Sequence, residues 1–285
     1  MIARRDIPYA AAHPAVHPGQ RLRLLSYNIQ VGIASRAWRE YFTAGWKHVL
    51  PTPERMRNLD RIAEVLSEYD IVGLQELDAG SLRSHFLNQA EYLALRADMP
   101  FWKHQTNRDL GHLAKHSLGL VARLIPYAVE HRALPGFLPG RGVMLARFGQ
   151  PGALLTVAVM HLALGRASRM RQMDFVADLL ADEPNAILMG DFNCLPQAPE
   201  MRLLLRRTGL LLPEKELHTY PSWRPSRMID YILISPSLRM REAEVLHLPH
   251  SDHLPLAVEV ELPPGKEALL VNPKAPVAKL TAEPA

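Results

Sequence analysis

Short apolar runs of strand length recur along this chain, and most of them end at a polar side chain. The runs cover 21–29, 69–76, 116–123, 142–147, 153–162, 186–193, 228–234 and 254–262. Between several of them, apolar residues recur at helical spacing, at 53–66, 81–97, 168–180 and 199–208, with Ser168 as the expected cap of the third helix. Strands that alternate mainly with helices predict an α/β (α+β) domain built in layers.

The chain is predicted to form one domain over residues 21–262, because no linker interrupts this range. Residues 1–20 hold breakers without periodicity, and we expect a loose N-terminal arm. Residues 263–285, rich in Pro, Ala and Lys, are expected to be disordered. We find no integral membrane segment, no secretory signal and a single cysteine, so the expected location is cytoplasmic.

The run 186–193 ends in Gly190-Asp191-Phe192-Asn193 and admits two interpretations. If the strand continues, its period of two places Asp191 and Asn193 on one face and Phe192 on the other. A carboxylate and a carboxamide side by side can hold and orient a small ligand. The same residues could instead close the strand with an Asx turn.

Several other strands finish in the same way. The polar residues at the strand ends are Asn28, Glu76, His161, Asp191 with Asn193, Asp230, and Asp252 with His253. One polar strand end is usually only an exposed terminus. Buried acids, however, are rare unless they are paired or bind metal, so the repeated placement predicts one shared site.

The composition of this residue set limits the chemistry. The chain has no Cys/His spacing for zinc, no Walker-type phosphate loop and no Gly-x-Ser-x-Gly motif. Oxygen ligands dominate, which favours a hard cation, Mg²⁺ with Mn²⁺ as a substitute. Because Mg²⁺ completes its coordination with water and substrate phosphate, the set indicates metal-assisted hydrolysis of a phosphoester.

The ordered motifs resemble the endonuclease/exonuclease/phosphatase superfamily of DNase I-like metal-dependent phosphoesterases. They are Ser26-Tyr27-Asn28-Ile29, Leu74-Gln75-Glu76, His161-Leu162, Gly190-Asp191-Phe192-Asn193, Ile229-Asp230-Tyr231 and Ser251-Asp252-His253. The resemblance covers roughly residues 21–262. It implies a four-layer α/β/β/α sandwich, with two packed mixed β-sheets flanked by helices and the site at one edge of the sheets.

The resemblance also assigns roles to the metal-binding and water-activating residues. It implies that Glu76 is the main Mg²⁺ ligand, assisted by Asn28 and Asp252. Asp191 is expected to orient and deprotonate the attacking water, and Asn193 to hold that water and a phosphate oxygen.

Three further positions are expected to act on the phosphate. By the same resemblance, His253 contacts the scissile phosphate while Asp230 fixes its tautomer. His161 donates to the phosphate or acts near the leaving group. All of these positions carry competent side chains, so we expect an active hydrolase of the EC 3.1 type.

Substrate-binding candidates are Arg224 and Arg227, which precede Asp230, and His116 in a polar connection. The net charge of +4 is a mild basic excess that suits an anionic substrate. We expect a phosphodiester substrate, nucleic acid or a phospholipid headgroup, and no obligate protein partner. The alternatives are a phosphomonoesterase acting on an inositol- or lipid-linked phosphate, and a non-catalytic phosphate- or nucleic-acid-binding module.

Overall fold

The computed structural model describes residues 21–32, 53–84, 86–109, 115–136 and 140–262. Both the expected arm at 1–20 and the expected tail at 263–285 lie outside the described residues.

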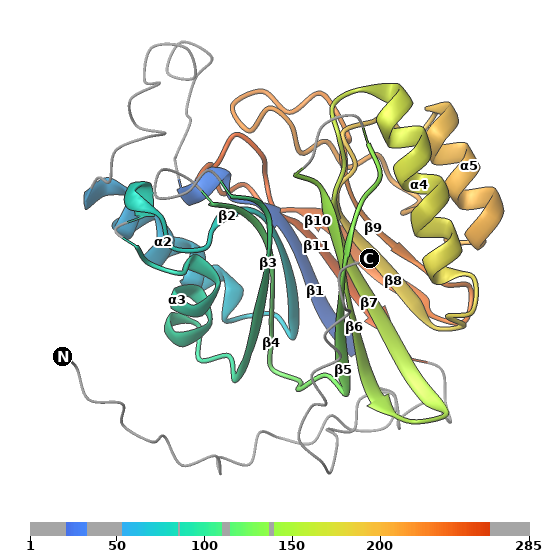
Figure 1. Cartoon of the computed structure of the whole chain (residues 1–285), viewed down its shortest axis with the longest axis horizontal. Coiled ribbons are helices and arrows are strands. Elements are labelled where there is room, and N and C mark those ends of the chain that lie inside the picture. The colour runs from blue at the N-terminus through green and yellow to red at the C-terminus, as the bar shows by residue number, and fades with distance from the viewer. Residues whose placement is uncertain (1–20, 33–52, 85, 110–114, 137–139, 263–285) are drawn as a thin grey trace.

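Two mixed β-sheets pack face to face (Figure 1). The first has six strands in the order β10 (Arg239–Val245), β11 (Leu256–Glu261), β1 (Arg21–Asn28), β2 (Ile71–Asp78), β4 (Lys115–Ala122) and β3 (Phe101–Asp109). The second has five, β5 (Ala128–Ala133), β6 (Gly142–Gln150), β7 (Ala153–His161), β8 (Ala186–Asp191) and β9 (Asp230–Ile234). Within them, β1 pairs parallel with β2, and β7 with β8.

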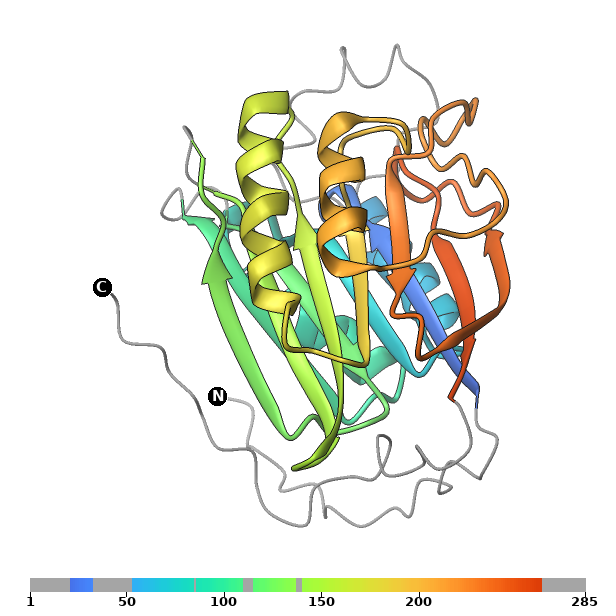
Figure 2. The same cartoon turned by 90° about the vertical axis from the view of Figure 1, so that its right-hand side faces the viewer.

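Helices cover the outer face of each sheet. α2 (Pro53–Leu66) and α3 (Gln89–Arg96) lie on the first sheet, while α4 (Arg166–Leu180) and α5 (Pro199–Thr208) lie side by side on the second (Figures 1 and 2). Two short 3₁₀ turns, η1 (Gln30–Gly32) and η3 (Leu82–Ser84), connect the elements of the first half. The arrangement confirms the predicted four-layer α/β/β/α sandwich.

The core between the sheets explains why these strands are so apolar. Leu24 and Ile71 from the first sheet are fully buried in one cluster with Val159 and Met189 from the second. The sheets approach so closely at Gly73 that a Cβ atom there would lie 2.6 Å from Met189 Sδ. Strands buried on both faces lose the polar alternation of exposed strands.

The expected helix boundaries need two corrections. Residues 81–97 do not form one helix, because the Asn88 side chain accepts hydrogen bonds from Ala90 N and Glu91 N and starts α3 there. The helix assigned to 168–180 begins at Arg166 with Gly165 as its N-cap, so Ser168 lies in its first turn.

Three strands escaped sequence prediction because they carry polar side chains. β10, β3 and β5 are the strands at three of the four sheet edges. β10 exposes most of its residues, and β3 and β5 are only partly buried. Edge strands commonly carry charged side chains, which removes the apolar run on which prediction depends.

Candidate active site

Strand register brings the polar strand ends to one edge of the sandwich. In the second sheet, His161 of β7 lies opposite Asp191 of β8, and Asp191 lies opposite Asp230 of β9. In the first sheet, Asn28 at the end of β1 lies opposite Gln75 of β2. A 3.3 Å hydrogen bond from Asn28 Nδ2 to Asp191 Oδ2 connects the two sheets at this edge.

Asp191 is the buried centre of this group. Its Oδ2 lies 3.3 Å from His161 Nε2 and 3.9 Å from His253 Nε2. Burial raises the pKa of Asp191, but the hydrogen bond from His161 and the charges of His253 and His161 outweigh it and hold the pKa below its usual range. The carboxylate therefore stays ionised and remains a hydrogen-bond acceptor at neutral pH.

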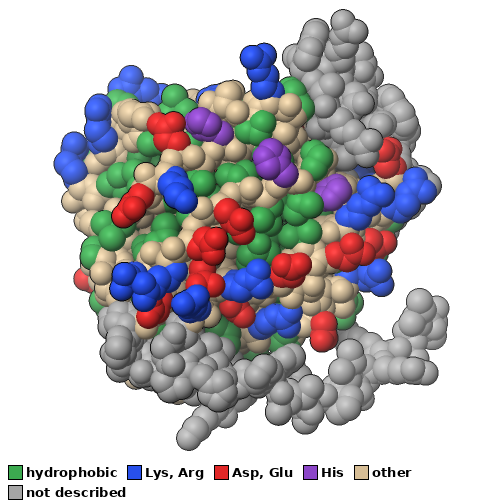
Figure 3. Space-filling view, turned by 180° about the vertical axis from the view of Figure 1, so that it is seen from behind, with side chains coloured by type: hydrophobic (Ala, Val, Ile, Leu, Met, Phe, Trp, Pro, Cys, Tyr) green, Lys and Arg blue, Asp and Glu red, His purple; other side chains and the backbone are tan. Residues whose placement is uncertain are grey.

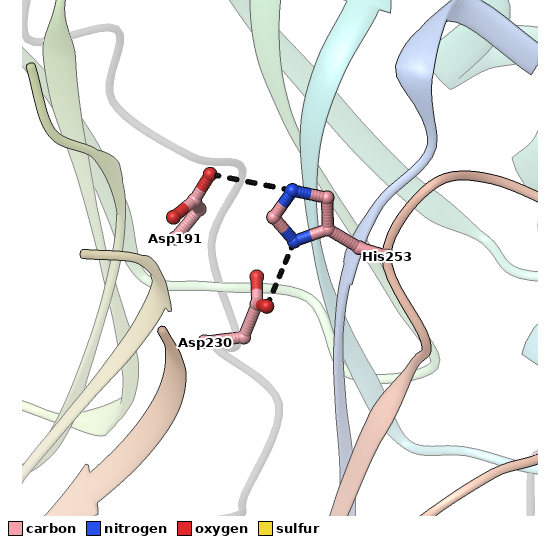
Figure 4. A group of neighbouring side chains, drawn as sticks. All are labelled: Asp191, Asp230 and His253. Carbon is pink, nitrogen blue, oxygen red and sulfur yellow. Dashed lines mark hydrogen bonds and ion pairs between the residues drawn. The ribbon is translucent and has the colours of Figure 1, made fainter. Parts of the chain in front are cut away.

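His253 lies between two carboxylates (Figure 4). Its Nδ1 donates to Asp230 Oδ2 at 2.8 Å, and its Nε2 faces Asp191. Burial opposes protonation of the ring, but the charges of Asp230 and Asp191 raise the pKa of His253 to about 10. Thr219 Oγ1 donates to the same Asp230 oxygen and fixes that carboxylate from the far side. His253 is therefore an oriented imidazolium at neutral pH.

Glu76 reaches the site because β2 is irregular there. The register between β2 and β4 shifts between Leu74 and Leu77, and Glu76 adopts a φ of +56°, in the left-handed region. Bulges redirect side chains, and a strained non-glycine residue commonly marks a functional position. The carboxylate is one-third exposed and lies 3.9 Å from His161 Nε2.

Asp252 joins the site from the segment that leads into β11. Ser251 Oγ donates to Asn28 O at 2.6 Å and lies 3.2 Å from Asp252 Oδ1, so the segment is fixed against the end of β1. Burial, with the nearby negative charges of Glu76 and Asp191, raises the pKa of Asp252 to about 6. These carboxylates repel one another without a cation between them.

Asn193 departs from the same-face arrangement that a continued strand would give. β8 ends at Asp191, and Asn193 adopts a φ of +51°. Its backbone N–H donates to Asp191 Oδ1 at 2.9 Å, which is an Asx turn, and its Nδ2 donates to Leu162 O at 3.0 Å. The turn interpretation is correct, and Asn193 lies beside Asp191 by folding back toward it.

Two groups of side chains could hold a cation. Asp191, Asp230 and His253 have ligand atoms within 4.8 Å of one another, but His253 Nδ1 is already bonded to Asp230, and its Nε2 faces Asp191 at 3.9 Å, beyond hydrogen-bond distance. A cation bound to this ring would have to displace a proton. Glu76 and Asp252 do not share a protonated ring in this way, and the charge of Glu76 helps to raise the pKa of Asp252, so their side of the site is the better fit for a divalent cation.

A cleft of about 390 Å³ opens beside Glu76 and His161. His116, one of the predicted substrate-binding residues, lines it. Arg224 and Arg227 do not line it but lie on the other side of the site, in the exposed loop before β9. The Arg227 guanidinium lies 5.9 Å from the Tyr220 ring, and that ring lies 4.8 Å from the His253 ring.

A sequence model of the endonuclease/exonuclease/phosphatase family matches residues 25–253. The chain belongs to this family. Members of the family are generally phosphoester hydrolases. No curated protein matches the chain by sequence. Among the described residues, no helix has the length and apolar character needed to cross a membrane.

Solved structures of low sequence identity share the family fold. An endonuclease/exonuclease/phosphatase from Beutenbergia cavernae is 22% identical with a TM-score of 0.66, over 85% of this chain and 72% of that one. Mannosyl-6-phosphatase from Bacteroides thetaiotaomicron is 18% identical with a TM-score of 0.62, over 84% and 99%. The catalytic domain of human Nocturnin is 17% identical with a TM-score of 0.60, over 84% and 94%.

Arg141 is a site residue that the family motifs in the sequence did not reveal. It lines the cleft and is partly buried within electrostatic range of Glu76 and Asp191. Burial lowers the pKa of its guanidinium, and the two carboxylates oppose that shift. No ion pair of Arg141 is found in the described part of the chain. The sequence signal is its position between Gly140 and Gly142 at the start of β6.

A largely buried ion pair supports one wall of the cleft, at Ala163 and Leu164. Arg169 on α4 forms an ion pair with the buried Glu200 of α5 at 2.8 Å, and its guanidinium donates to Ala163 O and Leu164 O. Arg169 therefore stabilises the loop after β7, and its role is structural.

Proposed function

We propose that this chain is a Mg²⁺-dependent phosphodiesterase in which Asp191 activates the attacking water. The observation that carries the proposal is the position of Asp191, a buried and ionised carboxylate beside His161 and His253 at the edge of a cleft that Glu76 lines. In this proposal, Asp191 is the base, the two histidines are the hydrogen-bond donors and Glu76 is the metal-binding carboxylate.

Glu76, Asp252 and Asn28 would hold the metal ion. The raised pKa of Asp252, caused by burial and by Glu76, marks a place where added positive charge is stabilising. Asn28 Oδ1 accepts one hydrogen bond from Gln30 N and retains a second lone pair as a ligand. A bound Mg²⁺ would supply Lewis-acid polarisation of the phosphate and neutralise its charge.

The remaining residues act on the water and the phosphate. Asp191 accepts a proton from the water that it orients, and the Asx turn of Asn193 keeps that carboxylate in place. His253, held by Asp230, presents an N–H to the charge that develops on the phosphate oxygens. His161, whose Nε2 lies 3.3 Å from Asp191 Oδ2, donates to the phosphate or acts near the leaving group.

Charge balance supports a diester over a monoester. Glu76, Asp191, Asp230 and Asp252 face the imidazolium of His253 and one guanidinium, so a single divalent cation neutralises the site. Among these groups no surplus positive charge remains for the dianionic form of a phosphomonoester, whereas a diester brings only one negative charge. Arg108, which also lines the cleft, is outside this count. Arg141 is placed to bind a non-bridging oxygen of that diester.

The outer surface gives less support to long nucleic acid. On the face shown in Figure 3, side chains of both charges are interspersed, which is typical of an ordinary solvated surface rather than of a groove that follows a phosphate backbone.

A phosphomonoesterase remains the second candidate. Its support is the cleft beside Glu76 and His161, together with the fold that this chain shares with mannosyl-6-phosphatase.

The test is hydrolysis of four substrates in parallel, with Mg²⁺ and with EDTA. The substrates are plasmid DNA, RNA, vesicles of sphingomyelin or phosphatidylinositol, and an inositol polyphosphate. We expect metal-dependent cleavage by the wild type and a loss of at least about a hundredfold in Asp191→Asn. Asp191→Asn also controls for contaminating nucleases, and Asp182→Asn, the same change at an exposed site, controls for the effect of the substitution itself.

Each outcome supports one of the three candidate functions. Cleavage of a diester by the wild type and Asp182→Asn, but not by Asp191→Asn, supports the proposal. Exclusive release of phosphate from the inositol polyphosphate identifies the phosphomonoesterase. Metal-dependent binding without turnover of any substrate would favour the non-catalytic binding module.

A further inference from the structure

The lining of the cleft includes a second group of polar side chains besides the proposed catalytic residues. In addition to Glu76 and His161, the cleft is lined by Asn107 and Arg108 of β3, His116 of β4, and Ser168 of α4. The side chains that position Asp191 and Asp230 are others, namely Asn28, His161, Thr219 and His253. We call the part of the cleft that Asn107, Arg108, His116 and Ser168 line its second end.

A β-bulge directs two consecutive residues of β3 into the cleft. The register between β3 and β4 shifts between Thr106 and Arg108, and Arg108 then lies directly opposite His116. Along a regular strand, Asn107 and Arg108 would point to opposite faces. The bulge redirects them, so both line the cleft, and Arg108 shares its side with His116.

Two glycines of the second sheet make room for these side chains. A Cβ atom at Gly140 would lie 3.0 Å from Arg108 Cβ and 3.3 Å from Arg108 Cδ. A Cβ atom at Gly142 would lie only 2.2 Å from Asn107 Oδ1. The absence of side chains at both positions allows the stem of Arg108 and the amide of Asn107 to pack against the start of β6 and the segment that leads into it.

The resulting end of the cleft is cationic and rich in donors. Arg108 makes no ion pair with any described side chain, so its guanidinium is available to a ligand. The first turn of α4 borders the cleft, and its N-cap Gly165 provides no side chain to bind the turn's N–H groups. Arginine, imidazole, hydroxyl and amide donors together match a phosphate group.

We infer that this end of the cleft, formed by Arg108, His116 and Ser168, binds a second phosphate of the substrate. The inference rests on the proposed function, since the scissile phosphate occupies the Glu76 end. The substrate class is then a phosphoester that carries another phosphate close to the bond that is cleaved. The second phosphate could belong to the next nucleotide or to a small bisphosphorylated molecule.

The experiment compares matched substrates that differ by one phosphate. Thymidine 5′-(p-nitrophenyl phosphate) is tested with and without a 3′-phosphate, and glucose 1,6-bisphosphate is tested against glucose 6-phosphate. For the wild type, we expect kcat/KM to be about tenfold or more higher for the doubly phosphorylated member of one pair, mainly through KM. The pair that shows this preference identifies the source of the second phosphate.

Arg108→Gln should reduce the preference to within about threefold, whereas Arg206→Gln, the same change on the exposed end of α5, should retain it. Equal kcat/KM values within both pairs for the wild type would overturn the inference. So would a preference that survives in Arg108→Gln.

Binding to Asp191→Asn by calorimetry separates this inference from the proposed function. If this variant binds the bisphosphorylated compound about tenfold more tightly, and the added Arg108→Gln change removes the difference, the second-phosphate site is supported even if no wild-type turnover is found. If the wild type cleaves a substrate with metal but Asp191→Asn binds both members of each pair equally, the proposed function stands and the second-phosphate site is refuted.

Discussion

The pair formed by Asp230 and His253 allows a quantitative test of the site, because both side chains are buried and share one hydrogen bond. Asp230 is 1% exposed and His253 is 5% exposed, and the atoms that join them are 2.8 Å apart. The perturbation is a double-mutant cycle with Asp230→Asn, His253→Gln and the double variant. Asparagine keeps the shape of Asp230 and removes only its charge.

The expected coupling follows from burial and from the position of the charge. Removal of one partner of a buried ion pair typically costs about 3–5 kcal/mol, since the other charge is left uncompensated. Here Asp191 Oδ2 lies 3.9 Å from His253 Nε2, so it still compensates part of the positive charge of His253 when Asp230 is removed. We therefore expect a coupling free energy of about 2–3 kcal/mol between Asp230 and His253.

The assay is the free energy of unfolding of all four proteins by denaturant titration, in EDTA. A matched cycle on the exposed pair His218–Glu216, whose charged atoms are 3.4 Å apart, should give less than about 0.5 kcal/mol. In turnover, each single variant should lose at least about a hundredfold in kcat, and the double variant should be no slower than the slower single. Additive losses in stability and in kcat would refute the reading that the two residues act as a unit.

Three further outcomes are expected. Mg²⁺ at a hundred times its Kd should raise the free energy of unfolding of the wild type by about 2.7 kcal/mol. Glu76→Gln should lose most of this gain. Equal stability of the wild type in Mg²⁺ and in EDTA would contradict the metal site. Burial raises the pKa of Cys194 to about 12, so a thiol reagent should label it only after unfolding, and immediate labelling of the folded protein would exclude this environment. Burial also lowers the pKa of His131 to about 4, so stability should be lost as the pH falls from about 6.5 toward 4, because the unfolded chain takes up this proton first. His131→Gln should flatten that acid limb, whereas His218→Gln, at an exposed position, should not.

The layers of the fold could be predicted because burial leaves a direct trace in the sequence. The runs that became β1, β2, β7 and β8 are almost continuously apolar, and the structure buries them between the two sheets and their helices. β3, β5 and β10 lie at sheet edges, where one face or more meets solvent. Their polar side chains give no apolar run, so their existence depends on partners that are distant in sequence.

The site could be predicted as a set of residues but not as a geometry. Strand register aligns His161, Asp191 and Asp230 in one row across the second sheet. The polar residue at the end of each strand was enough to predict that these side chains share a site. The bulge that redirects Glu76 and the Asx turn that folds Asn193 back are local departures from regular strand geometry, which periodicity cannot detect. The roles of these residues remain predictions until the variants are measured.

Each sheet supplies part of the site residues, so the site forms only when the two sheets pack together. The first sheet and its connections supply Asn28, Glu76 and Asp252, while the second supplies His161 and Asp191. The contacts between Asn28 and Asp191, and between His253 and Asp230, cross from one sheet to the other. A catalytic base and its metal ligands must hold their separation to within a fraction of an ångström, since a misplacement of about 1 Å can cost a hundredfold in rate. Here the close-packed core between the sheets fixes that separation, because it cannot be compressed and any shift would expose apolar surface. It follows that a substitution that loosens the core beneath this edge, far from any substrate, should lower kcat before it unfolds the protein.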